Sequence, residues 1–300
     1  MRTRIVHLSD AHIASEGKPY LPGVDLAARC ARAVTVVRGL DPAPGLIVLG
    51  GDMLDEGPSP DYGRLSDLLA GAPSPVHLCL GNHDSLDAFR RSPLPTFPAG
   101  CPGYYAFDEG QFRLFILFTA AARRGKGGID TTQLDWLAGE LESLGRAGAV
   151  AGSQRSDPLG SRLRVPFGPA PAVAGSQRSA LLFMHHPPVD VGIPWIDAIG
   201  VENAPEFWEV IGPYAARVAG IFFAHLHMQV SMTRQGILLA SPPAAGWQFR
   251  GDPVAARAET SDELPGFNVI DAWDEAVGEP ARAGVARSAG LLVRTVRFLP

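Results

Sequence analysis

Five short apolar runs in this chain end directly in clusters of aspartate, asparagine or histidine. The runs cover residues 5–8, 46–49, 76–80, 180–184 and 218–223. Short apolar runs bounded by turn-forming residues are typical of buried β-strands. Segments with helical spacing lie between them, at 24–40, 62–69 and 131–144, and this alternation predicts an α/β fold. Because ligands bind at the carboxyl ends of strands in α/β sheets, we expect the clusters to converge on one pocket.

Further apolar runs extend this pattern. Those at 112–118 and 237–240 predict two more strands, and those at 266–272 and 291–298 predict a β element near the C-terminus. We therefore expect a core domain over residues 1–250 and a C-terminal β extension over 251–300. The extension could cap the site or form the contact surface of a homo-oligomer.

The helix expected at 131–144 has the clearest spacing. Its leucines at positions 134, 137, 141 and 144 form one stripe, and Thr131 or Thr132 is expected to cap its start.

The segment that follows this helix departs from the alternation. The eight residues AVAGSQRS occur at 149–156 and again at 172–179, with residues rich in Gly, Pro, Ser and Arg between them. Two copies are too few for a repeat architecture, which needs about three stacked units. We expect a surface-loop insertion around 149–179, with a lid over the site as the alternative.

Composition limits what the chain binds. A formal net charge of −5 over 300 residues lacks the basic excess typical of nucleic-acid-binding proteins, so we expect no nucleic-acid partner. No apolar run approaches the roughly 18–20 residues that span a bilayer, and no signal peptide is visible, so we expect no membrane association. The three cysteines are scattered and outside CxxC spacing, which favours reduced packing thiols and a cytoplasmic protein.

The polar clusters contain six of the eight histidines. They are Asp10-Ala11-His12, Gly51-Asp52-Met53-Leu54-Asp55, Gly81-Asn82-His83-Asp84, His185-His186-Pro187-Pro188 and His225-Leu226-His227. Each alone is more often a turn or a surface loop than a site. Together they supply carboxylate, imidazole and amide groups in a fixed order at strand ends, which indicates a metal site.

This ordered set resembles the calcineurin-like metallophosphoesterase superfamily over residues 5 to about 245. The matching motifs are Asp-x-His, Gly-Asp-x-x-Asp, Gly-Asn-His-Asp, His-x-Pro and His-x-His. The His-His-Pro-Pro sequence and the segments 128–137 and 193–200 further resemble the class III cyclic-nucleotide phosphodiesterase and glycerophosphodiesterase branch. The resemblance implies a four-layer α-β-β-α sandwich with two mixed β-sheets.

The resemblance also implies two metal ions with seven protein ligands. These are Asp10, His12 and His227 for the first ion, Asn82, His185 and His225 for the second, and Asp52 as the bridge between them. Within the tandem histidines, His185 is preferred over His186 because it occupies the His-x-Pro position.

Other residues are assigned to the substrate. His83 is expected beside the phosphate as a catalytic residue that binds no metal, with Asp84 orienting it and Asp55 supporting the site. The residues expected to line the substrate pocket are His186, Trp195 and Asp197. For Trp195 the alternative is a packed tryptophan on a loop.

Two positions depart from the family pattern. Ala224 stands where the family usually has glycine before His-x-His, and we expect metal binding to be kept because alanine is small. Many relatives carry Asp-Ser or Asp-Thr after the strand at 112–118, where this chain reads Thr119-Ala120-Ala121. A substrate role for that segment is therefore in doubt.

The implied activity is hydrolysis of a small-molecule phosphodiester, of the cyclic-nucleotide or glycerophosphodiester type. Two cations about 3.5–4 Å apart would hold a bridging hydroxide for in-line attack and neutralise the phosphate oxygens. Mixed nitrogen and oxygen ligands favour Mn, Fe, Zn or Co over Ca or Mg.

Three alternatives stay open. A phosphomonoesterase or broad-specificity phosphatase could use the same metals. A nuclease is disfavoured by the acidic charge. A non-catalytic scaffold is expected to lose metal ligands, yet every ligand position is filled here.

Overall fold

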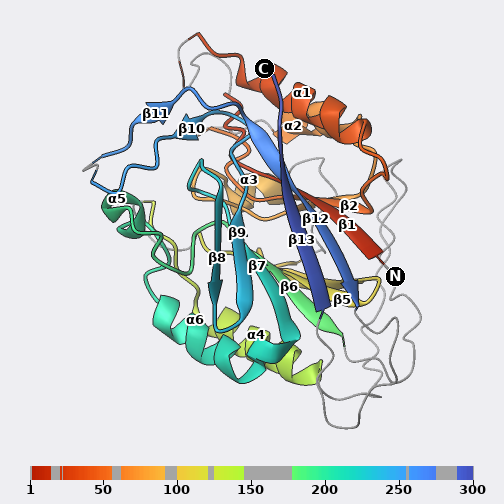
Figure 1. Cartoon of the computed structure of the whole chain (residues 1–300), viewed down its shortest axis with the longest axis vertical. Coiled ribbons are helices and arrows are strands. Elements are labelled where there is room, and N and C mark those ends of the chain that lie inside the picture. The colour runs from red at the N-terminus through yellow and green to blue at the C-terminus, as the bar shows by residue number, and fades with distance from the viewer. Residues whose placement is uncertain are drawn as a thin grey trace.

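Two large mixed β-sheets form the centre of the computed structural model (Figure 1). It describes residues 2–14, 21, 23–55, 62–91, 100–120, 125–144, 178–254, 257–274 and 289–299. Apart from residues 178 and 179, the duplicated octapeptides and the loop predicted at 149–179 lie outside this described part of the chain.

The first sheet has the strand order β13-β12-β1-β2-β3. Its members are β1 (Arg2–Leu8), β2 (Leu46–Leu49), β3 (Val76–Leu78), β12 (Gly266–Asp274) and β13 (Ala289–Arg297). Strands β1, β2 and β3 are parallel, whereas β12 runs antiparallel to both β1 and β13. The two strands predicted near the C-terminus are thus confirmed within this sheet: β12 lies beside β1, and β13 forms the edge beyond β12. The division of the chain at residue 250, and a role of the last residues as a cap or dimer surface, stay predictions.

The second sheet has the order β4-β5-β6-β7-β9-β8. Its members are β4 (Tyr105–Glu109), β5 (Phe112–Ile116), β6 (Ser179–Phe183), β7 (Val218–Phe222), β8 (Val230–Arg234) and β9 (Ile237–Ser241). The four central strands are parallel, and the edge strands β4 and β8 are antiparallel to their neighbours. A two-stranded pair, β10 (Gln248–Phe249) and β11 (Thr260–Ser261), lies outside both sheets.

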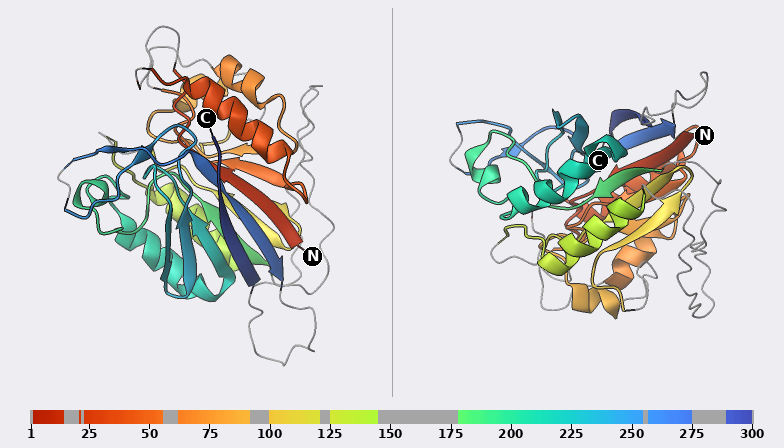
Figure 2. Two further views of the ribbon diagram at one scale, coloured as in Figure 1. Left: turned by 45° about the horizontal axis from the view of Figure 1, so that its top comes forward. Right: turned by 90° about the horizontal axis from the view of Figure 1, so that it is seen from below.

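Helices cover the outer faces of the two sheets (Figure 2). Helices α1 (Leu26–Arg38) and α2 (Tyr62–Leu69) pack on the first sheet, and α4 (Thr131–Ser143) and α6 (Ala204–Ile211) pack on the second. A third core between the sheets contains aromatic side chains such as Phe183 and Phe222. Three apolar interfaces between four layers confirm the predicted α-β-β-α sandwich.

Local chemistry explains where the two longest described helices begin. Asp25 caps α1 because its side chain accepts from the backbone N–H of Ala28. Asp130 caps α4 in the same way by accepting from Gln133 N–H, so the predicted cap at Thr131 or Thr132 is wrong by one residue. The predicted leucine stripe of α4 is buried against the second sheet.

Several elements were not expected from the sequence. They are β4, β8, β10, β11, α6, the short helices α3 (Leu86–Arg90) and α5 (Pro194–Asp197), and the 3-10 helix η1 (Gly212–Arg217). The edge strands are largely half-buried or exposed, so their sequences lack the continuous apolar run that identifies a central strand. No helix among the described residues is long and apolar enough to cross a membrane.

Candidate metal centre

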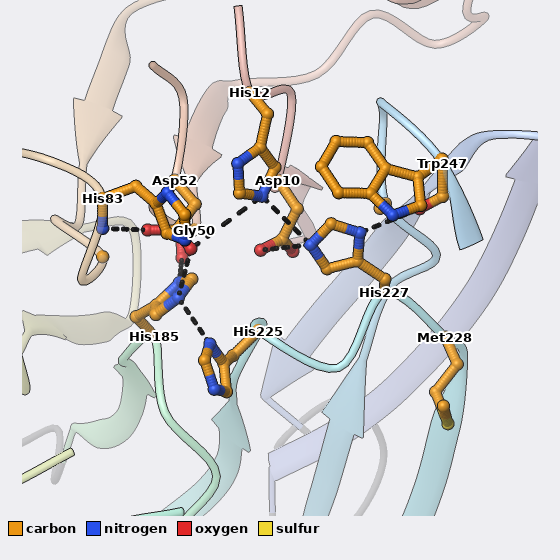
Figure 3. Close-up of polar contacts among 12 residues, drawn as sticks. Asp10, His12, Gly50, Asp52, His83, His185, His225, His227, Met228 and Trp247 are labelled. Atoms are coloured by element: carbon orange, nitrogen blue, oxygen red, sulfur yellow. Dashed lines mark hydrogen bonds and ion pairs between the residues drawn. The ribbon is translucent and has the colours of Figure 1, made fainter. Parts of the chain in front are cut away.

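Six of the seven predicted ligands lie together at the carboxyl ends of strands from both sheets (Figure 3), and Asn82 follows a neighbouring strand. The loops after β1, β2 and β3 carry Asp10, His12, Asp52 and Asn82, and those after β6 and β7 carry His185, His225 and His227. Backbone hydrogen bonds hold the loops together: Asp10 N–H donates to Gly51 at 3.0 Å, and Ala224 N–H donates to His185 at 2.9 Å. Five of the seven side chains are buried, and those of Asn82 and His225 are half-buried.

The backbone at this site adopts an uncommon conformation. Six described non-glycine residues have positive φ, and one of them, Gln235, lies in the turn between β8 and β9. The other five are predicted ligands: Asp10 (53°), His12 (45°), Asp52 (50°), His225 (70°) and His227 (48°). A left-handed backbone costs free energy for a side chain with a Cβ, and such residues concentrate at functional sites. At this site the left-handed backbone directs the side chains of these five predicted ligands toward one point (Figure 3).

The side chains form two groups that share one carboxylate. In the first, His12 Nε2 lies 3.0 Å from His227 Nε2, which lies 3.6 Å from Asp10 Oδ1. In the second, His185 Nε2 lies 3.1 Å from His225 Nδ1. Asp52 Oδ2 lies 3.1 Å from His185 Nε2 and 3.9 Å from His12 Nε2, between the two groups.

Backbone carbonyls fix the tautomers of two of these histidines. Nδ1 of His185 lies 2.8 Å from the carbonyl oxygen of Gly50, and Nδ1 of His227 lies 3.0 Å from that of Trp247. A carbonyl only accepts, so each Nδ1 carries a proton, and each Nε2 is the nitrogen directed at the site, where it would bind a metal in its deprotonated form. This is the orientation that metal-binding histidines usually have.

Several buried oxygens at the site lack adequate partners. Asn82 Oδ1 has no hydrogen bond to any described residue. Neither oxygen of Asp10 has a hydrogen bond of normal geometry. Burial raises the pKa of Asp10 to about 7, because it outweighs the opposing charge of His185, and the nearby Asp52 carboxylate raises it further. Buried polar groups are normally satisfied, and a cation would satisfy these. The residues present therefore fit divalent metal ions.

The charges at the site are strongly coupled. Burial lowers the pKa of His227 to about 3, so this imidazole is neutral. Burial also opposes protonation of His185, but the neighbouring Asp52 carboxylate outweighs it and raises the pKa of His185 to about 9. In the metal-free protein, a protonated His185 therefore supplies positive charge beside Asp52.

His83 and its neighbours are arranged differently from the expectation. Asp84 was expected to orient His83, but Oδ2 of Asp84 accepts from the backbone N–H groups of Asp52 (2.8 Å) and Gly81 (3.0 Å). The His83 ring pairs with Asp55, whose Oδ1 lies 3.6 Å from Nδ1. Asp84 thus holds the loops after β2 and β3 together, while Asp55 is the carboxylate beside the catalytic candidate.

The three residues expected in the substrate pocket have distinct partners. His186 is buried beside Thr119, whose Oγ1 lies 2.9 Å from its Nδ1. Trp195 is half-buried and packs edge-on against Phe249, with ring centroids 5.2 Å apart. Asp197 accepts from the backbone N–H groups of the 191–192 turn at 2.7 and 3.1 Å, so its carboxylate stabilises that turn.

Two further residues contribute to the site, and sequence reasoning missed both. Trp247 supplies the carbonyl that orients His227, and its ring lies 4.6 Å from that of His12. Gly50 supplies the carbonyl that orients His185, and a Cβ at this position would meet His7 Nε2 at 2.6 Å and Ala224 Cβ at 3.2 Å. Ala224 therefore fits in place of the usual glycine because residue 50 has no side chain. Both roles depend on backbone atoms, which no side-chain motif reveals.

Comparisons with known proteins agree with this geometry. The family model of calcineurin-like phosphoesterases matches residues 3–229. A probable cyclic nucleotide phosphodiesterase from Rhodopseudomonas palustris is 28% identical over 78% of this chain and 75% of its own length. The glycerophosphodiester phosphodiesterase GpdQ from Enterobacter lignolyticus is 24% identical over 79% of this chain and 76% of its own.

The fold has relatives among solved structures. A dimetal phosphatase from Danio rerio superposes with a TM-score of 0.55 at 15% identity, covering 90% of this chain and 95% of that one. The family match extends over most of the chain and includes every predicted ligand. This protein is a hydrolytic phosphoesterase that belongs to the calcineurin-like phosphoesterase family.

Proposed function

We propose that this protein hydrolyses phosphodiesters with two divalent metal ions. Asp10, His12 and His227 would hold the first ion, and Asn82, His185 and His225 the second. The observation that carries this proposal is the position of Asp52: one carboxylate oxygen faces an imidazole of each group, at 3.1 and 3.9 Å. A shared carboxylate sets the short separation that two-metal hydrolysis needs.

The bound ions would supply an activated water and neutralise the phosphate oxygens. The chain's own residues would do the rest. His83 is half-buried beside His12, with ring centroids 4.8 Å apart, and its backbone N–H donates to Asp52 at 2.9 Å. From this position its imidazole would donate a proton to the leaving oxygen as the P–O bond breaks, with Asp55 orienting the ring. General acid help of this kind is typically worth about 10²–10⁴-fold.

The substrate class rests on the relatives. Their names include cyclic nucleotide and glycerophosphodiester phosphodiesterases. We propose a small diester of one of these two types, with Mn, Fe, Zn or Co as the metals. Trp195 and Phe249 are half-buried near His227 and would contact the ester group beyond the phosphate.

The test compares two model substrates after the protein is loaded with each metal in turn. Bis(p-nitrophenyl) phosphate reports diester hydrolysis, and p-nitrophenyl phosphate reports monoester hydrolysis. We expect the diester to be turned over faster, and His83→Ala to lower that rate by about 10²-fold or more. Faster turnover of the monoester would favour the phosphatase alternative. A protein that binds no metal, or turnover unchanged in His83→Ala, would overturn the enzyme mechanism proposed for this site.

The natural substrate is then sought with cyclic AMP and glycerophosphocholine. Hydrolysis of either by the wild type, and its loss in His83→Ala, would assign the class.

A further inference from the structure

His225 has one ring nitrogen directed to the proposed metal position and one directed away from it. Its Nδ1 lies 3.1 Å from His185 Nε2, inside the second group of ligands. Its Nε2 is buried, with no hydrogen-bond partner in the part of the chain that the structure describes. An imidazole that binds a metal through Nδ1 carries its proton on Nε2, and that proton normally has an acceptor. His225 Nε2–H therefore needs an acceptor close to its ring.

His186 provides a matching acceptor. Its ring centroid lies 4.6 Å from that of His225, and its own Nε2 is also buried without a hydrogen-bond partner among the described residues. The polar contact of its ring involves the other nitrogen: Nδ1 lies 2.9 Å from Thr119 Oγ1. With the proton on Nδ1, donated to this hydroxyl oxygen, Nε2 would have a free lone pair.

The position of His186 is fixed by its surroundings. Its backbone N–H donates to Thr119 Oγ1 at 3.2 Å, so one threonine side chain contacts both its backbone and its ring. Gly127 packs directly on the imidazole, and a Cβ there would lie only 2.5 Å from the Cβ of His186. This is the segment whose departure from the family pattern left the role of Thr119 in doubt.

We propose that His186 is a positioning residue. The two adjacent Nε2 atoms are not hydrogen-bonded in the structure, and a small rotation of the rings on metal binding would let Nε2 of His186 accept the Nε2–H of His225, while Thr119 holds His186 in the tautomer that can do so. The chain Thr119–His186–His225 would thus direct His225 Nδ1 to the second metal ion. The inference rests on the proposed two-metal function and extends it to residues outside the ligand set. The competing arrangement is direct metal binding by His186, because ligand atoms of His185, His186 and His225 lie within 4.8 Å of one another.

The test uses three variants of His186 in the full chain. His186→Gln keeps a polar atom near the position of Nε2, His186→Asn keeps one near Nδ1, and His186→Phe keeps a ring with neither. Affinities for two Co²⁺ ions are measured by the visible spectrum and by equilibrium dialysis. We expect the second ion to bind about 10–100-fold more weakly to the Asn and Phe variants, the usual effect of removing such an outer partner. The Gln variant should bind both ions like the wild type, and the first ion should be unaffected throughout.

Thr119→Val and Thr119→Ser form a second, matched pair. The valine removes the hydroxyl at nearly constant shape and should lower the affinity for the second ion. The serine keeps the hydroxyl and should leave that affinity unchanged. This pair tests the inference even where a His186 variant fails to fold. Unfolding midpoints in chelator separate loss of metal binding from loss of stability.

The outcomes are distinct. Wild-type affinity for the second ion in His186→Asn, His186→Phe and Thr119→Val overturns the inference and leaves the two-metal proposal standing. An equal loss of affinity for the second ion in His186→Gln and His186→Phe overturns the inference in favour of direct metal binding by His186. A wild-type protein that binds no Co²⁺ overturns the proposed function and the inference with it.

Discussion

Asp10 and Asp271 are both fully buried carboxylates on the first sheet, yet their surroundings are opposite. Asp271 lies on β12 directly across from Arg4, which donates to it at 2.7 and 3.1 Å. Arg2 and Arg294 also reach it, at 2.7 and 3.1 Å, with side chains that remain half exposed. Asp10 follows β1 and has no arginine partner among the described residues.

This difference separates a structural carboxylate from a functional one. Burial would raise the pKa of Asp271, but hydrogen bonds from Arg4 and Arg2 outweigh it and hold the pKa below its usual value. For Asp10 burial prevails, and the pKa rises to about 7. Arginines offset the burial of Asp271, whereas the burial of Asp10 is only partly offset, which leaves this carboxylate available for a cation.

The largest expected effect is on activity in Asp10→Asn. Loss of one cation removes several kcal/mol of transition-state stabilisation, so kcat/KM for bis(p-nitrophenyl) phosphate should fall by at least about 10²-fold. The free energy of unfolding in chelator should not fall, because the substitution removes a carboxylate whose burial is costly. A variant with wild-type activity, or one less stable than the wild type in chelator, would contradict the role of Asp10 as a metal ligand.

Asp271→Asn should show the reverse. It leaves the largely buried Arg4 without its counter-charge, which should lower the free energy of unfolding by about 3 kcal/mol. Thermal denaturation should show a fall in Tm of roughly 6–12 °C for a chain of this size. Metal affinity should be unchanged, as a Co²⁺ titration would check. A fall in the free energy of unfolding below about 1 kcal/mol would mean that the ion pairs with these arginines contribute little to stability.

Metal addition should stabilise the wild type more than Asp10→Asn. A ligand that binds only the folded state at 100 times its Kd adds about 2.7 kcal/mol. We therefore expect Tm to rise with Mn²⁺ concentration in the wild type and in Asp271→Asn. The rise should be smaller in Asp10→Asn, and equal rises in all three proteins would contradict the assignment of Asp10.

The smallest effect concerns acid stability. Because the pKa of Asp271 is lowered in the folded state, its stabilisation is complete above the unfolded value of about 4 and is lost as the pH falls through the folded value. The difference in unfolding free energy between wild type and Asp271→Asn, measured in chelator, should be constant above about pH 4 and shrink below it. A difference that does not change with pH would show that the ion pair does not control it.

The sequence predicted the central parts of the fold well. Parallel strands such as β1, β2 and β6 are buried on both faces, so their apolar runs are continuous and easy to identify. The two edge strands of the second sheet gave no such signal, and β4 and β8 were missed for that reason. Short helices such as α3 and α5 are defined by a single turn and carry little periodicity.

At the site, the motifs predicted which side chains gather but not how they contact one another. The family match and the strand-end positions followed from residue order. The partners of Asp84 and the pairing of His83 with Asp55 were not visible, because carboxylates in two adjacent loops are equivalent candidates until the loops are folded.

By itself, the sequence determined the α/β architecture, the family and the set of residues at the strand ends. These depend on local properties: apolar runs, turn residues and the spacing of donor groups along the chain. Only the tertiary structure decided that Asp52 lies between two groups of ligands, that carbonyls of Gly50 and Trp247 fix the tautomers, and that His186 lies against His225. Such features join segments that are distant in the sequence, within one sheet or across both, and their geometry is set by how the strands and sheets pack rather than by any segment alone.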